Sequence, residues 1–249
     1  MDASDDRQRA AAIPTAMILA AGRGERMRPL SDATPKPLLR VRGKPLIVLQ
    51  IERLVAAGFA NLVINVAYLG ASIEAACGDG RAFGATIRYS REGEPLEVAG
   101  GIATALTLLD RDVTLVVSGD IHTAFDYASL LPRLAAMKAT REPPHAHMVM
   151  VPNPDYHPGG DFALVDGVLS LLAQPRLTFG NIALYRTALF EGMPRGERLK
   201  ILPLYRDWIA RGWVSGERYD GGWTNVGTPA ELKQLDERLA MTAGEKALR

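Results

Sequence analysis

Two kinds of apolar segment alternate along the first half of the chain. Short runs that are apolar at nearly every position predict buried strands over residues 15–21, 62–66, 86–89 and 113–117. Segments with apolar positions on one helical face lie between these runs and predict helices over residues 45–57, 71–77 and 101–109. This alternation predicts an α/β fold with a Rossmann-like, mostly parallel sheet and helices on both faces.

The second half shows longer gaps between its apolar runs. The pattern predicts helices over residues 127–139 and 229–239, strands over residues 147–151 and 177–185, and a hairpin that joins residues 162–165 to 168–172 through Asp166-Gly167. No internal repeat or low-complexity linker divides the chain. We therefore expect one domain over residues 14–249, preceded by a polar, disordered leader at residues 1–13.

Composition and charge remove several classes of protein. The 249 residues carry a formal net charge of +1, so no overall field favours nucleic acid or an anionic membrane. Cys77 is the single cysteine, which excludes an intrachain disulfide and a cysteine-based zinc site. No apolar run approaches the roughly 18 residues of a membrane span. We expect a cytoplasmic protein, a monomer or small homo-oligomer, with no nucleic-acid or membrane partner.

The loop after the first strand has the composition of a phosphate-binding site. Gly22 and Gly24 allow backbone N–H groups to approach phosphates, and basic side chains follow closely, namely Arg23, Arg26, Arg28 and Lys36. A dinucleotide-binding fingerprint requires a third glycine where Met27 stands, and the Gly-Lys-Ser/Thr of a Walker A loop is absent. The loop therefore predicts a triphosphate site of another kind.

These motifs resemble those of the sugar-1-phosphate nucleotidyltransferases, which have a glycosyltransferase-A-like fold. The resemblance rests on Leu19-Ala-Ala-Gly-x-Gly-x-Arg-Met-x-Pro-Leu30 and Pro35-Lys-Pro-Leu38, and it continues through residues 42–46, 117–120 and 225–229. It implies that a nucleoside triphosphate and a sugar 1-phosphate react directly and release pyrophosphate. The catalytic residues would be Arg26 and Lys36, and the loop around the nucleotide would consist of Ala20, Ala21, Gly22 and Gly24.

A magnesium site is implied at the end of the strand over residues 113–117. Asp120 follows this strand, and ligands of open α/β sheets gather at the carboxyl ends of the strands. The family resemblance places Mg²⁺ on Asp120 and Asn225. Many relatives have aspartate at the second position, whereas those that act on N-acetylglucosamine 1-phosphate have asparagine. The amide oxygen of asparagine is also a ligand for Mg²⁺.

The stretch Glu92-Gly-Glu-Pro-Leu-Glu-x-x-Gly-Gly-Ile102 resembles N-acetylmuramate 1-phosphate uridylyltransferases of peptidoglycan recycling. The resemblance implies that UTP is the donor and that Leu96, Gly100 and Gly101 lie against the nucleoside. Val98 replaces the threonine expected at that position. Glu92 is instead suited to the N1–H and N2–H₂ edge of guanine, which leaves mannose-1-phosphate guanylyltransferase, with GTP, as an alternative.

The remaining candidates hold the sugar phosphate, and by the resemblance they are Asp161, Asn181 and Lys200. Two other functions stay open: a catalytically silent sensor of sugar nucleotides and an NAD(P)-dependent oxidoreductase. The second lacks both the third glycine and an acidic residue after the strand at 62–66, where Val66-Ala67-Tyr68 stands. The preferred function is Mg²⁺-dependent transfer of UMP from UTP to N-acetylmuramic acid 1-phosphate.

Overall fold

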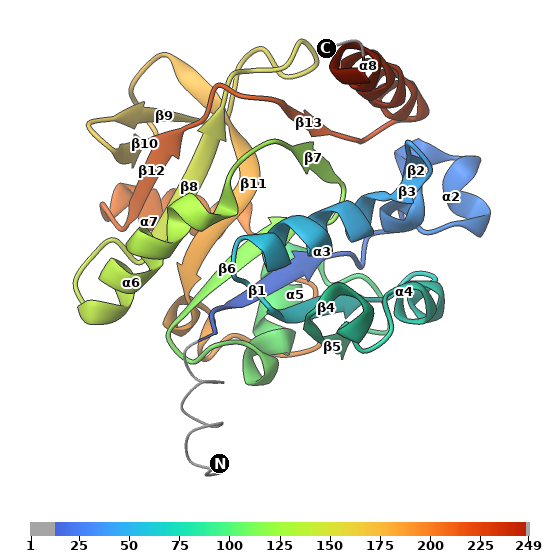
Figure 1. The fold of residues 1–249 in the computed structure, drawn as a ribbon. Helices are drawn as coiled ribbons and strands as arrows, with labels where there is room; N and C mark the ends of the chain where they lie inside the picture. Colours follow the sequence, from blue (N-terminus) through green and yellow to red (C-terminus); the bar gives the residue numbers. More distant parts are fainter. Residues whose placement is uncertain (1–12, 248–249) are drawn as a thin grey trace, which may run out of the picture.

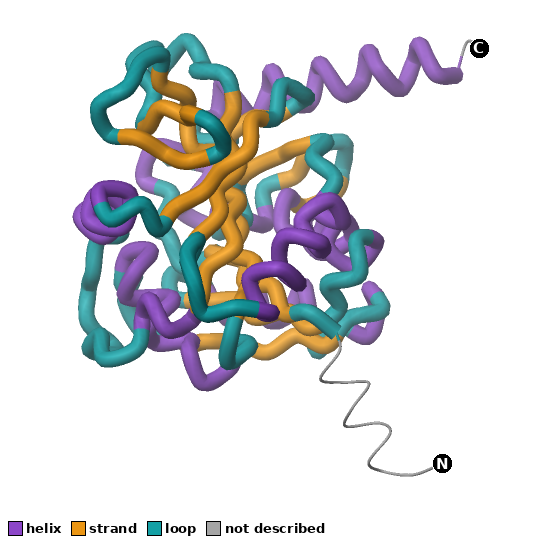
Figure 2. The backbone as a smooth tube through the Cα atoms, turned by 90° about the vertical axis from the view of Figure 1, so that its left-hand side faces the viewer, coloured by secondary structure: helices purple, strands orange, loops and turns teal. Residues whose placement is uncertain are grey.

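The computed structural model describes residues 13–247, with side chains up to residue 241. The expected leader therefore lies outside the described residues, apart from Ile13. The central feature is a nine-stranded sheet in the order β5-β4-β1-β6-β11-β8-β12-β10-β9, which runs through the middle of the molecule (Figures 1 and 2). Element labels follow Figure 1, including its gaps in numbering.

Four parallel strands form the N-terminal half of the sheet, namely β1 (Thr15–Leu19), β4 (Asn61–Val66), β5 (Thr86–Arg91) and β6 (Val113–Ser118). Side chains of β1 alternate between two cores: Ala16 and Ile18 pack toward α3 (Leu46–Ala56), and Met17 packs toward α5 (Glu97–Ala105). Figure 1 shows these helices on opposite faces of the sheet. Burial on both faces explains why these strands are continuously apolar.

The C-terminal half of the sheet is mixed. It contains β8 (Ala146–Val151), β9 (Phe162–Val165), β10 (Val168–Ser170), β11 (Arg176–Arg186) and β12 (Val214–Arg218). The long strand β11 runs antiparallel to β6, β8 and β9, whereas β12 runs parallel to β8. The α/β class is confirmed, and the parallel strands that the apolar runs predicted are concentrated in the first half.

The two longest elements of the second half that the pattern-based prediction lacks are a helix and a strand. They are α7 (Leu202–Ala210) and β12. Strand β12 contains Ser215, Gly216, Glu217 and Arg218, so its alternation of apolar and polar positions is weak. The other helices, α4 (Gly70–Cys77), α6 (Leu131–Ala139) and α8 (Pro229–Ala247), lie where periodicity placed them. Helix α8 runs eight residues beyond its predicted end and projects from the body in Figure 2.

Short elements join the two halves near the carboxyl ends of β1 and β6. Strand β13 (Trp223–Asn225) pairs with β7 (Ile121–Thr123) and brings Asn225 opposite Ile121. The short helices α2 (Leu30–Ala33), η1 (Glu25–Met27) and η2 (Lys36–Leu38), with the β2–β3 hairpin (Arg40–Val41, Lys44–Pro45), shape the chain after β1. A third core, which contains Met27, Leu46, Val226 and Leu235, packs this region against α8.

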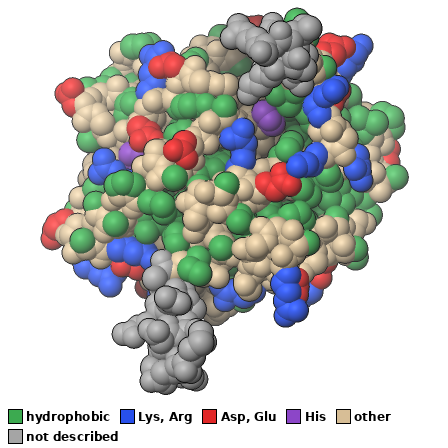
Figure 3. Space-filling view, viewed as in Figure 1, with side chains coloured by type: hydrophobic (Ala, Val, Ile, Leu, Met, Phe, Trp, Pro, Cys, Tyr) green, Lys and Arg blue, Asp and Glu red, His purple; other side chains and the backbone are tan. Residues whose placement is uncertain are grey.

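The surface gives no separate indication of function. Lys, Arg, Asp and Glu side chains are interspersed on the face drawn in Figure 3, and no large patch carries charge of one sign. Across residues 13–247, no helix combines the length and the apolar character that crossing a membrane requires.

Candidate active site

A cavity of about 820 Å³ opens at the carboxyl ends of β1 and β6. A second cavity of about 320 Å³ adjoins it and shares Leu19, Gly22, Leu96 and Asp120 with it. Most of the residues proposed for nucleotide binding and catalysis border one or both cavities, namely Ala20, Ala21, Gly22, Gly24, Arg26, Lys36, Glu92, Leu96 and Asp120. We call these two cavities together the cleft.

The loop after β1 packs against the protein at Gly24 and Met27 and faces open space at Gly22. Gly24 has a φ of 64° and lies so close to Lys36 that an added Cβ would be 3.0 Å from the Lys36 Cβ, whereas Gly22 faces open space. Met27 is fully buried in the third core. A buried anchor at the position where a dinucleotide fingerprint has glycine explains why this loop follows a different path.

The segment after β13 leaves room for the guanidinium of Arg26. A Cβ on Gly227 would be 3.3 Å from Arg26 Nη2, so this glycine permits the close approach. Glu231 accepts hydrogen bonds from the Gly227 N–H (2.7 Å) and the Thr228 hydroxyl (3.1 Å). This arrangement resembles a capping box at the start of α8, and it fixes the Gly227 backbone against Arg26.

Lys36 and Asp120 meet inside the cleft although 84 positions separate them. The Lys36 ammonium lies 2.6 Å from Asp120 Oδ2, and the two side chains are 11% and 28% exposed. Lys36 begins the short helix η2 between two prolines, and Asp120 follows β6, so both side chains come from short, constrained segments. The site thus holds one cation and one carboxylate in direct contact.

Asn225 is brought near Asp120 through its backbone, although it borders neither cavity of the cleft. The Val226 N–H donates to the Asp120 carbonyl at 2.9 Å, which fixes β13 beside Asp120. Asn225 Oδ1 is buried and has no hydrogen-bond partner. A buried oxygen without a partner is costly unless a ligand satisfies it. An amide oxygen without a partner suits Mg²⁺, which prefers oxygen ligands and retains waters and substrate phosphates.

No three His, Cys, Asp or Glu side chains cluster as a metal site among the described residues. Asp120 and Asn225 would therefore supply a small part of the coordination, and phosphate and water oxygens the rest.

Tyr156 is a residue near the site that the sequence did not single out. It lies in the loop after β8, and burial followed by the charge of Glu231 raises its pKa, while Asn225 and Arg26 oppose the rise. This loop contains Pro152, Pro154 and Pro158, a composition typical of a connection between elements. The phenol is 54% exposed, so it stands at the rim.

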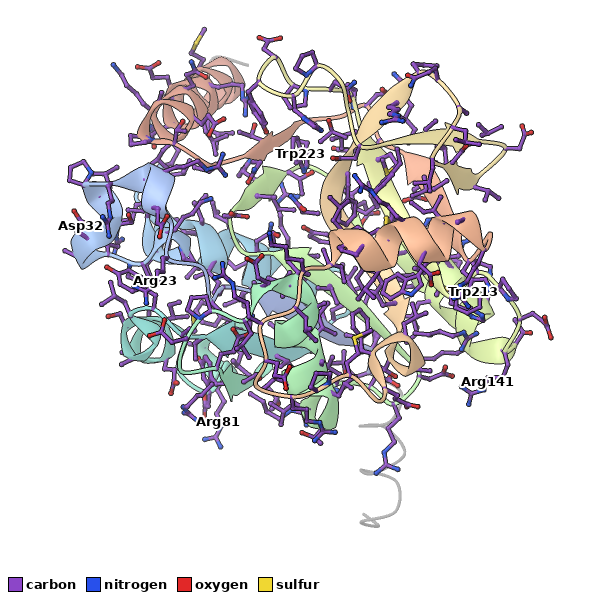
Figure 4. The ribbon with its side chains drawn as sticks, turned by 180° about the vertical axis from the view of Figure 1, so that it is seen from behind. Arg23, Asp32, Arg81, Arg141, Trp213 and Trp223 are labelled. Carbon is purple, nitrogen blue, oxygen red and sulfur yellow. The ribbon has the colours of Figure 1, made fainter. Side chains whose placement is uncertain are left out.

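Arg23 crosses the mouth of the cleft rather than pointing into it. Its guanidinium lies 2.5 Å from Glu94 Oε2 and 5.7 Å from the centre of the Tyr68 ring. Glu94 raises the pKa of Arg23 through this hydrogen bond and its charge. Figure 4 labels Arg23 beside the loop after β1 and Trp223 on β13. The loop expected to bind phosphate is thus tied to the segment expected to bind the base.

The two glycines of α5 are packed inside the protein, next to the cleft. Gly100 and Gly101 are buried and border neither cavity. A Cβ on Gly100 would be 2.1 Å from the Glu197 carbonyl, and one on Gly101 would be 2.7 Å from Glu92 Oε1. Both glycines therefore allow close packing behind the cleft, whereas Leu96 borders it.

The residues expected to hold the sugar phosphate separate into two groups. Asn181 borders a small cavity of about 80 Å³, which touches the cleft through Leu19, Val98 and Ser118. Asp161 instead accepts hydrogen bonds from the Phe179 N–H (2.8 Å) and contacts His157 (3.1 Å), and it borders a different cavity.

Lys200 is exposed and borders none of these cavities, so the structure brings neither it nor Asp161 into the cleft. Arg198 borders both parts of the cleft and pairs with Glu97 at 2.8 Å. Both Lys200 and Arg198 are candidates from the sequence for a cation that pairs with a carboxylate of the acceptor, and residues 194–200 lack regular structure. Two neighbouring cations in such a segment cannot be separated by sequence position alone.

The sequence matches the nucleotidyl transferase family over residues 15–155. It is 46% identical over 228 residues to the N-acetylmuramate alpha-1-phosphate uridylyltransferase of Neisseria meningitidis, covering 88% of this chain and 95% of that protein. The protein of the same description from Caulobacter vibrioides is 31% identical, covering 90% of this chain and 96% of its own. A mannose-1-phosphate guanylyltransferase of Mycobacterium tuberculosis is 39% identical over 47% of this chain and 32% of its own length.

Solved structures with the same fold are more distant in sequence. HddC from Yersinia pseudotuberculosis, complexed with GMP-PN, superimposes with a TM-score of 0.70 at 18% identity, covering 91% of this chain and 99% of that one. A Bacillus anthracis protein assigned as a glucose-1-phosphate thymidylyltransferase gives a TM-score of 0.77 at 19% identity, covering 90% and 94%.

Proposed function

This chain belongs to the nucleotidyl transferase family and is a sugar-1-phosphate nucleotidyltransferase, and we propose that it transfers UMP from UTP to N-acetylmuramic acid 1-phosphate. The observation that carries the proposal is the 46% identity over 95% of a uridylyltransferase of that specificity. The guanylyltransferase match covers 32% of its relative, which supports UTP over GTP.

In the proposed reaction, an oxygen of the sugar phosphate attacks the α-phosphorus of UTP. The new P–O bond forms as the bond to the β-phosphate oxygen breaks, and pyrophosphate leaves with its electron pair. The attacking phosphate is already anionic near neutral pH, so a general base is not required. The products are a UDP-sugar and pyrophosphate.

The cations of the cleft are suited to the charge that this reaction develops. Arg26, fixed beside Gly227, would stabilise the α-phosphate and the leaving group, and the loop amides of residues 20–24 would bind the other phosphates. Lys36, held by Asp120 at 2.6 Å, would orient a phosphate oxygen. One well-placed donor of this kind contributes about 3–4 kcal/mol to the transition state.

Asp120 and Asn225 would hold Mg²⁺, and the support for this is the buried, unpartnered Oδ1 of Asn225 beside Asp120. A bound Mg²⁺ supplies positive charge that aligns the phosphates and offsets their repulsion. The Lys36 ammonium contacts the Asp120 carboxylate directly, so it would neutralise the charge of this carboxylate when Mg²⁺ is absent.

The acceptor would lie along Ser118, Asn181 and the small apolar cavity that joins the cleft. N-Acetylmuramic acid carries a lactyl carboxylate, for which Arg198 at the edge of the cleft is the available cation.

We further propose that residues 14–249 act as one domain, in a cytoplasmic pathway of peptidoglycan recycling, as a monomer or small homo-oligomer. The support for one domain is that β9, β10 and β12 of the second half extend the sheet of the first half.

The test is a matrix of UTP, GTP, CTP and ATP against several sugar 1-phosphates, with pyrophosphate release as the readout. The proposal requires the highest kcat/KM for UTP with N-acetylmuramic acid 1-phosphate. A preference for GTP with mannose 1-phosphate would refute it and establish the guanylyltransferase alternative.

A further inference from the structure

Asn65 is a buried polar residue in an otherwise apolar strand. It is 3% exposed, lies near the end of β4, and is the only polar residue of the run from Leu62 to Val66. Strand β4 lies between β1 and β5, where Asn65 is in register with Leu19 and Ser90. A buried amide requires partners for both its oxygen and its nitrogen, so its contacts define its role.

The Asn65 amide joins two loops that arise from different strands. Its Oδ1 accepts a hydrogen bond from the Ala20 N–H at 2.8 Å, at the start of the phosphate-binding loop. Its Nδ2 donates to Glu92 Oε1 at 2.6 Å. The opposite amide orientation would place NH₂ against N–H and oxygen against carboxylate, so this pattern of donors and acceptors has a single solution.

Glu92 extends the connection to the segment expected to bind the base. Its second oxygen, Oε2, accepts from the Leu96 N–H at 3.0 Å. Burial raises the pKa of Glu92, and the hydrogen bonds from Asn65 and Leu96 counteract the rise. Gly101 provides the space for this pair, since an added Cβ would be 2.7 Å from Glu92 Oε1 and 2.9 Å from Asn65 Nδ2.

We propose that Asn65 is a positioning residue that fixes the phosphate-binding loop and the base-binding segment relative to each other, and thereby sets the preference among nucleotides; this rests on the nucleotidyl transfer proposed above. Asn65, Glu92 and Leu96 all border the 320 Å³ part of the cleft. The chain of hydrogen bonds from Ala20 through Asn65 and Glu92 to Leu96 therefore forms one wall of the cleft.

This arrangement also favours uracil over guanine. Guanine presents two adjacent donors, which a carboxylate matches only when both of its oxygens face the base. Asn65 and Leu96 hold the two oxygens of Glu92 toward separate protein donors. Uracil presents one N–H and needs one acceptor, so it tolerates this constraint.

The first variant is Asn65→Ala, which releases Ala20 and Glu92 together. Loss of a buried hydrogen bond that positions substrate groups is expected to lower kcat/KM for UTP by about tenfold, mainly through KM. The ratio of kcat/KM for UTP to that for GTP is expected to fall by about fivefold as the Glu92 carboxylate becomes free to turn. A purely structural role would lower Tm and leave this ratio unchanged.

A reversal of polarity provides the rescue. In Asn65→Asp a carboxylate faces Glu92, and in Glu92→Gln two donors compete, so each single variant is expected to lose activity. In the Asn65→Asp/Glu92→Gln double variant, the new carboxylate accepts from the Ala20 N–H and from the new amide, whose oxygen still accepts from the Leu96 N–H. We expect the double variant to recover most of the wild-type kcat/KM for UTP.

The matched control is Asn153→Ala. Asn153 also ties two backbone segments through its amide, to the carbonyls of Pro158 and Arg176 at 3.0 Å, but it does not border the cleft. We expect this control to lower Tm and leave the UTP-to-GTP ratio unchanged.

Two results would overturn the proposal: a double variant no more active than the weaker single variant, or an Asn65→Ala ratio equal to that of wild type. If the wild-type enzyme does not use UTP, the proposed function is refuted. The recovery of kcat/KM in the double variant would then be measured with the nucleotide that the enzyme does accept.

Discussion

The substitution Asn225→Asp tests the proposed metal site separately from the other residues of the cleft. It keeps the shape of the side chain and replaces a neutral amide by a carboxylate beside Asp120. The wild-type Oδ1 is buried without a partner, and the Val226 N–H donates to the Asp120 carbonyl at 2.9 Å. The variant therefore adds a second negative charge near Asp120, where Lys36 already pairs with that carboxylate and Arg26 lies against Gly227.

The size of the effect follows from these contacts. At an effective dielectric constant of about 20, two like unit charges repel by about 4 kcal/mol at roughly 4 Å and by less at greater separation. The ion pair with Lys36 and the 28% exposure of Asp120 screen this repulsion, to about 1–2 kcal/mol. A buried, charged oxygen without a partner adds about 1–3 kcal/mol. A total near 3 kcal/mol would lower Tm by roughly 6–12 °C in a chain of this size when no metal is present.

The assay is thermal unfolding, measured in EDTA and in saturating Mg²⁺, each with and without UTP but without a sugar acceptor. A cation between the two carboxylates removes their repulsion and binds the variant more tightly than wild type. We expect the variant to be less stable than wild type in EDTA, and to gain several degrees more from Mg²⁺ than wild type gains.

The control is Asn61→Asp, which adds the same charge at the beginning of β4, where the Asn61 amide donates to the Ile13 carbonyl. Its Mg²⁺-dependent change in Tm should equal that of wild type. Equal Mg²⁺-dependent changes in all three proteins would refute the placement of the cation at Asn225.

Four further outcomes are expected. Asp120→Ala should remove measurable turnover and retain the wild-type circular dichroism spectrum; activity within threefold of wild type would contradict its role as a ligand. Arg26→Ala should lower kcat by about 10²–10³-fold with a smaller change in KM, because its charge acts in the transition state, and Arg26→Lys should rescue it only in part. Arg198→Ala should reduce kcat/KM for N-acetylmuramic acid 1-phosphate more than for N-acetylglucosamine 1-phosphate, whereas Lys200→Ala should leave their ratio unchanged in a competition assay. Burial raises the pKa of the Cys77 thiol to about 11 from 9.0, so between these two pH values the unfolded chain loses its thiol proton and the folded chain retains it. The free energy of unfolding should therefore fall by about 2–3 kcal/mol between pH 9 and 11 in urea unfolding experiments. Cys77→Ala should reduce this loss.

The outline of the fold was accessible from apolar periodicity wherever burial was uniform. The strands β1, β4 and β6 are covered on both faces, so nearly every residue in them is apolar and the run is easily recognised. Strand β12 was missed because residues such as Gly216 and Glu217 weaken its pattern, and its pairing with β8 and β10 supplies stability that no local signal shows.

The proposed site was predictable to different degrees in its different parts. The residues within a continuous motif, from Ala20 to Arg26, were expected in the cleft and border it. Gly100 and Gly101 were expected against the nucleoside, and the structure shows them packed against the Glu197 carbonyl and the Glu92 carboxylate. Asn65 is an isolated polar residue in a buried strand, a feature that the sequence shows but that the motif-based interpretation did not consider.

The sequence by itself determined the class of chemistry and the local shape of the phosphate-binding loop. Both depend on neighbouring residues, because glycine conformation, strand burial and the spacing of basic side chains are set within a few positions. Only the tertiary structure decided which distant groups meet: Lys36 with Asp120 across 84 positions, and Asn65 with Glu92 across 27. It also separated Arg198 from Lys200 and Asn181 from Asp161. The physical reason is that sheet pairing and core packing place the ends of strands side by side, and such contacts leave no fixed spacing in the sequence.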